Sequence, residues 1–374
     1  MTNYEMRKGI IDALQKKRKS VVVTYFNLTD RANTPQYVIG DDAIRPLHAL
    51  LEQIGHQNTI DLFIYTRGGS MMAAYNIVKL FREYTDKFNV IIPFRAHSGG
   101  TQIALGADSI SMSKIGQLSP VDPSTANQFN PILNPTGNPT DPRNRKPISV
   151  EDVQAYLNLS RERVGLVSED DRLEVFKELT KYYEPLALGN VNRVYMETRL
   201  IAKEVLSLHM REEKDPDKID AIVKALTETY THDFLISRDL AEKIGLKIIR
   251  PTPEEEGLIM RLYDSYESEM KMNIPFDADA IIAARRLAHT QALQPSTPQA
   301  PQQVQTVMFK IKLAAIESLT DSFTWVTDGS IIPPAQCAPQ GMPPQMGLQI
   351  GVPSVMLKLG RWYNITELEG MSFE

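Results

Sequence analysis

The sequence of 374 residues contains a single cysteine, Cys337, so no disulfide bond can form within one chain. One cysteine in a chain of this length favours a reducing compartment. No apolar run is long enough to span a bilayer, and the first 20 residues lack the apolar centre of a secretory signal peptide. We therefore expect a cytoplasmic protein without an integral membrane segment.

The net charge of the chain is small, and the common metal-binding motifs are absent from the sequence. The chain carries 41 basic and 46 acidic residues, a net charge of -5, which argues against nucleic acid as the main partner. Its six histidines are scattered, and neither H-E-x-x-H nor C-x-x-C occurs. The phosphate-binding patterns G-x-G-x-x-G and G-x-x-x-x-G-K-[ST] are absent too. The sequence thus predicts no metal and no cofactor.

Two strand, glycine turn and helix units follow one another along the chain. Each begins with an apolar run that is typical of a buried parallel strand, residues 60–65 (IDLFIY) and 88–94 (FNVIIPF). The first run leads into Thr-Arg-Gly-Gly-Ser, and the second leads into His-Ser-Gly-Gly-Thr. A helix after the first turn has apolar residues at helical spacing: Ala74, Ile77, Val78 and Phe81.

This arrangement makes Ser98 the candidate for chemistry. Both turns follow parallel strands, so they lie at the same edge of the sheet, and the Gly68-Gly69 backbone faces Ser98 there. Ser98 also precedes a helix, whose first N–H groups favour developing negative charge. Two glycines after Ser98 leave room for a substrate carbonyl to approach the backbone. The competing interpretation is ordinary turn chemistry, for which small Ser/Gly clusters are common.

At this point the sequence resembles a known family. The ordered blocks IDLFIYTRGGSMMAAYNIVKLFREY, VIIPFRAHSGGTQIALGADSISMSKIGQLSPVDPS and YTHDFLISRDLAEKIGLKI are similar to the serine dehydrogenase proteinase family, relatives of signal peptide peptidase A and the Clp protease proteolytic subunit. The resemblance covers residues 20–250. It implies an α/β fold of the Clp/crotonase type, a superhelix of stacked ββα units, and frequent self-assembly.

Carried over to this chain, the family pattern implies that Ser98 is the nucleophile. The same pattern makes the backbone N–H groups of Gly69 and Gly99 the donors of the oxyanion hole. Gly99 departs mildly from the alanine that usually follows the family's serine. The implied function is a serine endopeptidase that hydrolyses peptide or protein substrates, and the implied assembly is a homo-oligomer.

The general base is left open by the sequence. The position of a Clp-type histidine holds Ser-Pro-Val-Asp-Pro, and His97 directly precedes Ser98, a geometry that seldom lets a side chain reach its neighbour. Relatives of signal peptide peptidase use a lysine further along, for which Lys146 is the candidate. His232, followed by Asp233, has the better intrinsic chemistry for a base. Each also has a structural interpretation, a solvated lysine and a histidine that binds a turn.

The chain divides, by its patterns, into three parts. Residues 1–250 form the Clp/crotonase-like peptidase domain, 251–293 a helical extension, and 294–374 a Pro/Gln-rich linker and partly low-complexity C-terminal tail with one short ordered piece around Trp325. Within the domain, residues 124–147 form a long loop, either a substrate gate or a surface insertion. Helical patterns follow from residue 150, and capping boxes are expected at Ser149 and Ser168.

Three functions remain open. The serine peptidase is favoured because a serine occupies the nucleophile position. A catalytically inactive Clp-like assembly scaffold is the first alternative, since the Clp histidine is missing. A crotonase-like acyl-CoA enzyme is the second, because it uses the same glycine geometry on a thioester enolate without a serine nucleophile.

Overall fold

The computed structural model describes residues 3–121, 124–138, 141, 144–210, 216–228, 234–292, 306–333, 336–337, 348–349 and 353–374. The chain forms two compact units. The first consists of Met1–Val38, Arg45–Gly55 and Glu254–Glu374, and the second of Ile39–Ile44 and His56–Pro253. Of the helices in this described part of the chain, none combines the length and apolarity that a membrane crossing requires. The predicted cytoplasmic location stays a prediction.

The second unit contains a parallel sheet. Its strands lie in the order β10, β5, β3 and β2, and every neighbouring pair is parallel. The bounds are β2 (Gln57–Tyr65), β3 (Thr85–Ile92), β5 (Ser109–Met112) and β10 (Ile248–Ile249). Helix α3 (Met71–Glu83) follows β2, and helix α4 (Gly99–Leu105) precedes β5. The two predicted strand, turn and helix units are therefore present, and the predicted α/β class is confirmed.

The apolar residues of helix α3 are buried on one face, as their spacing in the sequence predicts. Ala74, Ile77, Val78 and Phe81 are all fully buried, as their helical spacing predicts. Ser70 caps the helix, and its Oγ accepts the N–H of Ala73 at 3.2 Å. The first glycine turn thus passes directly into a helix whose packing fixes its position.

Further short strands and helices complete the second unit. A three-stranded sheet has the order β4, β6, β9, and β7 pairs with β8. The bounds are η1 (Asp41–Ala43), β4 (Arg95–Ala96), β6 (Gln117–Leu118), β7 (Ser124–Thr125), β8 (Ile148–Ser149), α5 (Val150–Asn158), η3 (Leu159–Arg163), α6 (Glu169–Tyr182), α7 (Pro185–Ser207), α8 (Pro216–Glu228), β9 (Ile236–Ser237) and α9 (Arg238–Ile244). Ser149 and Ser168 cap α5 and α6, and at Ser168 both bonds of the capping box are present.

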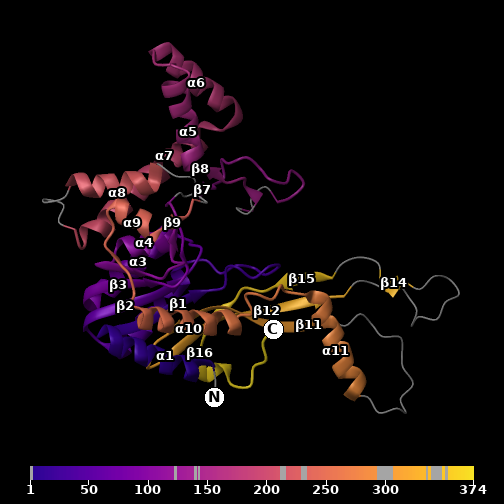
Figure 1. Ribbon diagram of the computed structural model, residues 1–374. Coiled ribbons are helices and arrows are strands. Elements are labelled where there is room, and N and C mark those ends of the chain that lie inside the picture. The colour runs from indigo at the N-terminus through magenta and orange to yellow at the C-terminus, as the bar shows by residue number, and fades with distance from the viewer. Residues whose placement is uncertain are drawn as a thin grey trace. The chain divides into compact units, whose positions relative to one another are not determined.

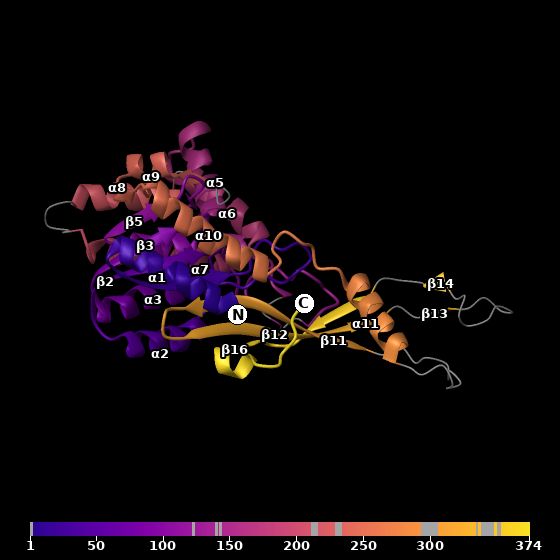
Figure 2. The same ribbon diagram turned by 60° about the horizontal axis from the view of Figure 1, so that its bottom comes forward.

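The first unit is built around an antiparallel sheet. Strand β11 pairs with β1 on one side and β12 on the other, and β15 and β16 both pair with β12. The bounds are α1 (Asn3–Arg18), β1 (Val21–Asn27), α2 (Ile44–Ile54), α10 (Pro253–Glu269), α11 (Ala278–Ala292), β11 (Val307–Glu317), β12 (Ser322–Ile332), β13 (Gln336–Cys337), β14 (Leu348–Gln349), β15 (Ser354–Leu357), β16 (Arg361–Asn364) and η5 (Ile365–Leu368). Helices α1 and α10 lie side by side in both views (Figure 1 and Figure 2).

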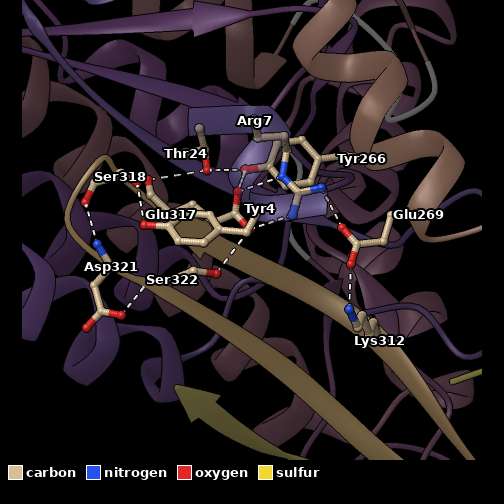
Figure 3. A network of polar contacts seen from close by, with 10 residues as sticks. All are labelled: Tyr4, Arg7, Thr24, Tyr266, Glu269, Lys312, Glu317, Ser318, Asp321 and Ser322. Carbon is tan, nitrogen blue, oxygen red and sulfur yellow. Dashed lines mark hydrogen bonds and ion pairs between the residues drawn. The ribbon is translucent and has the colours of Figure 1, made fainter. Parts of the chain in front are cut away.

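Part of the predicted C-terminal tail forms strands of a sheet. Only a short piece around Trp325 was expected, whereas β11 and β12 are 11-residue strands that run side by side (Figure 1). The register of β11 on β1 places Thr24 opposite Glu317. Glu317 also belongs to a polar network with Arg7 and Tyr266, which joins α1, α10 and β11 (Figure 3).

Candidate active site

The two glycine turns of the second unit meet at the ends of β2 and β4. The Thr66 N–H donates to the Arg95 carbonyl at 3.0 Å, and the His97 N–H donates to the Thr66 carbonyl at 3.1 Å. A methyl carbon on Gly68 would lie 2.8 Å from Cβ of Ser98, and one on Gly99 would lie 3.3 Å from the Gly69 nitrogen. The Gly68-Gly69 backbone therefore faces Ser98 and Gly99 at contact distance.

In the first turn, the N–H groups on either side of Gly69 already have acceptors. Gly68 donates to Oγ1 of Thr66 at 3.0 Å, and Ser70 donates to the Ile39 carbonyl at 2.8 Å. Ile39 in turn donates to the Gly68 carbonyl at 2.8 Å. The C=O of Gly68 and the N–H of Gly69 belong to one trans peptide and point in opposite directions, so the Gly69 N–H points away from Ile39. No acceptor for it occurs among the residues that the structure describes.

The second turn repeats this pattern around Gly99. The Ser98 N–H donates to Oγ of Ser119 at 2.8 Å, and the Gly100 N–H donates to the His97 carbonyl at 2.7 Å. Within the described part of the chain, the Gly99 N–H between them has no acceptor. Each glycine turn thus presents one N–H without an acceptor among the described residues, and a methyl carbon on Gly99 would approach the Gly69 nitrogen to 3.3 Å.

Ser98 has an unusual backbone conformation, with φ 48° and ψ -110°. A positive φ is uncommon for a residue with a side chain and persists only where the surroundings hold it. Ser98 occupies the N-cap position of α4, yet its side chain makes no capping hydrogen bond. A half-buried hydroxyl on a sharp strand-to-helix turn, not engaged by its own helix, is the arrangement that exposes a serine nucleophile.

The candidate bases are not brought to Ser98 in the same way. Lys146 lies two residues before the start of β8, and its N–H donates to the Pro131 carbonyl at 2.7 Å while its carbonyl accepts from Asn130 Nδ2 at 3.0 Å. The Lys146 side chain is exposed, and the described residues include no hydrogen bond between it and Ser98. His232 lies outside the described residues. The roles of both stay predictions.

Two polar residues near Ser98 could not be predicted from the sequence. Thr101 and Ser119 are buried, and their hydroxyls bind the backbone around Ser98. Thr101 stands in a helix of small residues, and Ser119 follows a two-residue strand, so neither belongs to a pattern that predicts a contact with Ser98. The one available signal is a polar residue between the buried Leu118 and Val121.

Replacing Gly69 with alanine is expected to destabilise the protein. A methyl group there would lie 2.3 Å from the carbonyl oxygen and 2.4 Å from the nitrogen of Ile39, and φ is 147°. Overpacking and an unfavourable φ each cost about 1–3 kcal/mol, so we expect a loss of at least about 2 kcal/mol in urea unfolding. Gly189→Ala is the matched control, because that helical glycine has open space around it and alanine favours a helix. Equal midpoints for Gly69→Ala and the wild type would contradict the close approach of Ile39.

Part of the chain is similar to a known family of serine proteinases. Residues 1–138 match the model of a family described as ClpP-like SDH-type serine proteinases. The match confirms the resemblance predicted from the sequence for this part of the chain, and it supports a serine peptidase in general.

Other similar proteins are more distant. Two uncharacterized proteins of Methanocaldococcus jannaschii are each 27% identical, one over 263 residues (69% of this chain and 78% of that protein) and one over 205 residues (54% of this chain and 56% of that protein). A solved membrane-bound stomatin-specific protease in complex with a substrate peptide is 15% identical, covers 63% of this chain and 78% of its own, and has a TM-score of 0.33. A probable enoyl-CoA hydratase/isomerase from Mycobacterium abscessus is 12% identical over 68% of this chain and 81% of its own, with a TM-score of 0.25.

Proposed function

We propose that this protein is a serine endopeptidase in which Ser98 attacks the peptide carbonyl and the N–H groups of Gly69 and Gly99 bind the oxyanion. One observation carries the proposal. Each glycine turn directs the N–H groups around its central glycine to protein acceptors and leaves one N–H without any among the described residues, next to a half-buried serine hydroxyl. Preorganised donors of this kind are usually the largest electrostatic contribution to acyl transfer.

The proposed reaction has two steps. Oγ of Ser98 forms a bond to the carbonyl carbon while its proton passes to a base, and the carbonyl oxygen becomes an anion held by the two N–H groups. The C–N bond then breaks, and the leaving amine takes the proton from the base. In the second step, water attacks the acyl-serine ester by the same route and releases the carboxylic acid and Ser98.

The base is proposed to be Lys146 or His232. The backbone N–H and carbonyl of Lys146 bind Pro131 and Asn130, respectively. The backbone of Lys146 is therefore held in place, while its side chain is exposed. To act as base, its Nζ must come within about 3 Å of Ser98 Oγ in the complex with substrate, a distance that often closes only then.

Labelling with a fluorophosphonate tests the proposal, because this probe phosphonylates an activated serine. We expect the wild type to be labelled and Ser98→Ala to remain unlabelled. Ser168→Ala is the matched control: it removes another serine hydroxyl, which only caps α6, and should be labelled like the wild type. Lys146→Ala and His232→Ala test the two base candidates. The variant that lacks the true base should be labelled at least about 10²-fold more slowly than the wild type.

The inactive assembly scaffold predicts a different result. If the wild type is labelled no more than Ser98→Ala while a control hydrolase reacts, Ser98 is not activated and the scaffold interpretation replaces the peptidase. Labelling that persists in both base variants would leave Ser98 as nucleophile and remove Lys146 and His232 from the mechanism.

We also propose that the protein assembles as a homo-oligomer. Helix α6 has no buried residue, and it carries the exposed apolar side chains of Leu173, Phe176 and Tyr182. Leu173 and Phe176 lie three residues apart on one side of α6, and large apolar side chains exposed together are typical of a contact surface.

A further inference from the structure

The Ser119 hydroxyl binds the Ser98 backbone directly, and the Thr101 hydroxyl in turn binds the Ser119 backbone. Oγ of Ser119 accepts the Ser98 N–H at 2.8 Å and lies 3.0 Å from the Pro120 carbonyl, to which it donates. Oγ1 of Thr101 accepts the Ser119 N–H at 3.1 Å and lies 2.9 Å from the Ala96 carbonyl and 2.8 Å from the Ser119 carbonyl. Ser119 is 2% exposed and Thr101 is fully buried.

These contacts oppose the conformation that Ser98 would otherwise prefer. Serine at an N-cap normally has an extended backbone, and its Oγ accepts an N–H from the first turn of its own helix. Ser98 instead has φ 48° and makes no such bond. A strained conformation persists only when its surroundings hold it, and the acceptor that holds the Ser98 N–H is Ser119.

The same bond determines which N–H groups are available to a substrate. With the Ser98 N–H bound to Ser119, the nucleophile's own N–H cannot serve the oxyanion, and the free donor of this turn is Gly99. Without the Ser119 hydroxyl, Ser98 can relax toward an ordinary N-cap. Its Oγ would then turn back onto helix α4 and away from the Gly69 and Gly99 donors.

We propose that Ser119 is a positioning residue: its hydroxyl holds the Ser98 backbone in the conformation that presents Oγ for attack, and Thr101 fixes the Ser119 backbone. This inference rests on the proposed peptidase function. Ser119 contacts no substrate and moves no proton in this role. Its loss should therefore lower kcat and the rate of fluorophosphonate labelling, with KM and the pH profile unchanged.

The test compares Ser119→Ala with Ser113→Ala. Ser113 is the matched control, because its buried Oγ also donates to a proline-residue carbonyl, that of Pro93, and accepts an N–H, that of Ile115, but it does not touch Ser98. We expect Ser119→Ala to be labelled about 10²-fold more slowly than the wild type, the size of effect that a small misplacement of a reacting group produces. Ser113→Ala should be labelled at the wild-type rate, although its thermal midpoint should fall about as much as that of Ser119→Ala.

Thr101 provides the second pair of variants. Thr101→Ser keeps the hydroxyl and should keep most of the labelling rate, whereas Thr101→Val removes it and should behave like Ser119→Ala. Hydrogen exchange at the Ser98 amide provides a readout that needs no activity, and we expect faster exchange in Ser119→Ala than in Ser113→Ala.

The outcomes separate this inference from the proposed function. If the wild type is labelled and Ser119→Ala reacts at the wild-type rate, or if both alanine variants slow equally, Ser119 does not position the nucleophile. If the wild type is not labelled at all, the peptidase proposal fails, and hydrogen exchange still decides whether Ser119 holds the Ser98 N–H. A shifted pH profile in Ser119→Ala would contradict a purely positioning role.

Discussion

Replacing Ser98 with alanine is expected to lower kcat for peptide hydrolysis by about 10⁴- to 10⁶-fold, the loss that follows removal of the nucleophile in serine peptidases. The neighbouring hydroxyls of Ser119 and Thr101 cannot take its place, because both are buried and engaged with backbone groups. Substrate affinity should change little, since alanine removes only the oxygen. The measurement is the steady-state rate on an unstructured protein or peptide substrate.

Two further variants separate chemistry from folding. Ser98→Gly tolerates a φ of 48° better than alanine does, and it should be equally inactive if the hydroxyl is what matters. Both proteins should have urea midpoints near that of the wild type and should still bind a labelled peptide. Activity within tenfold of the wild type in either variant would exclude Ser98 as the nucleophile.

The parts of this site that could be predicted from sequence are those that depend on local signals. The strand-like runs, the glycine pairs and the spacing of Ala74 and Ile77 are each contained in a short window, and the edge rule for parallel strands brings their ends together. The positions of Gly69, Ser98 and Gly99 follow from these signals. Their exact placement also depends on Ile39, which binds the first turn, and on Ser119, which binds Ser98.

The remainder depends on contacts that no local pattern encodes. Ser119 reaches Ser98 only because β4 and β6 pair, and their register is set by two residues on each strand. Strand β11 is identified as part of a sheet only once its partner β1 is known. Composition alone suggested a tail there, because the surrounding Pro/Gln-rich segments dominate the pattern.

Replacing Glu317 with alanine is expected to destabilise the protein by about 3–5 kcal/mol, the cost of removing one partner from a buried ion pair. Glu317 is 1% exposed, and its carboxylate accepts two bonds from Arg7 at 2.7 Å, one from the Tyr266 hydroxyl at 2.6 Å and one from Ser322 at 3.1 Å (Figure 3). Arg7 is also buried, and it pairs with Glu269 at 2.5 Å. Without the Glu317 carboxylate, the buried Arg7 guanidinium loses two of its hydrogen bonds and keeps only Glu269 as an ion-pair partner among the described residues.

The network also fixes the protonation of Tyr266. Burial, and after it the charge of Glu317, raises the pKa of Tyr266 well above its ordinary value, so its hydroxyl keeps its proton and donates to Glu317. Thr24 of β1 completes the set, with its Oγ1 2.6 Å from the Tyr266 hydroxyl. One substitution at Glu317 therefore loosens contacts between β1, α1, α10 and β11 together.

Glu254→Ala is the matched control, because Lys17 and Glu254 also join α1 to α10, by a 2.5 Å ion pair that is exposed to solvent. An exposed pair contributes little, so its loss should leave the urea midpoint close to that of the wild type. The double variant Arg7→Met with Glu317→Leu should be more stable than Glu317→Ala alone, since it removes the buried charge together with its partner. Equal midpoints for Glu317→Ala and Glu254→Ala would show that the buried network does not hold the first unit together.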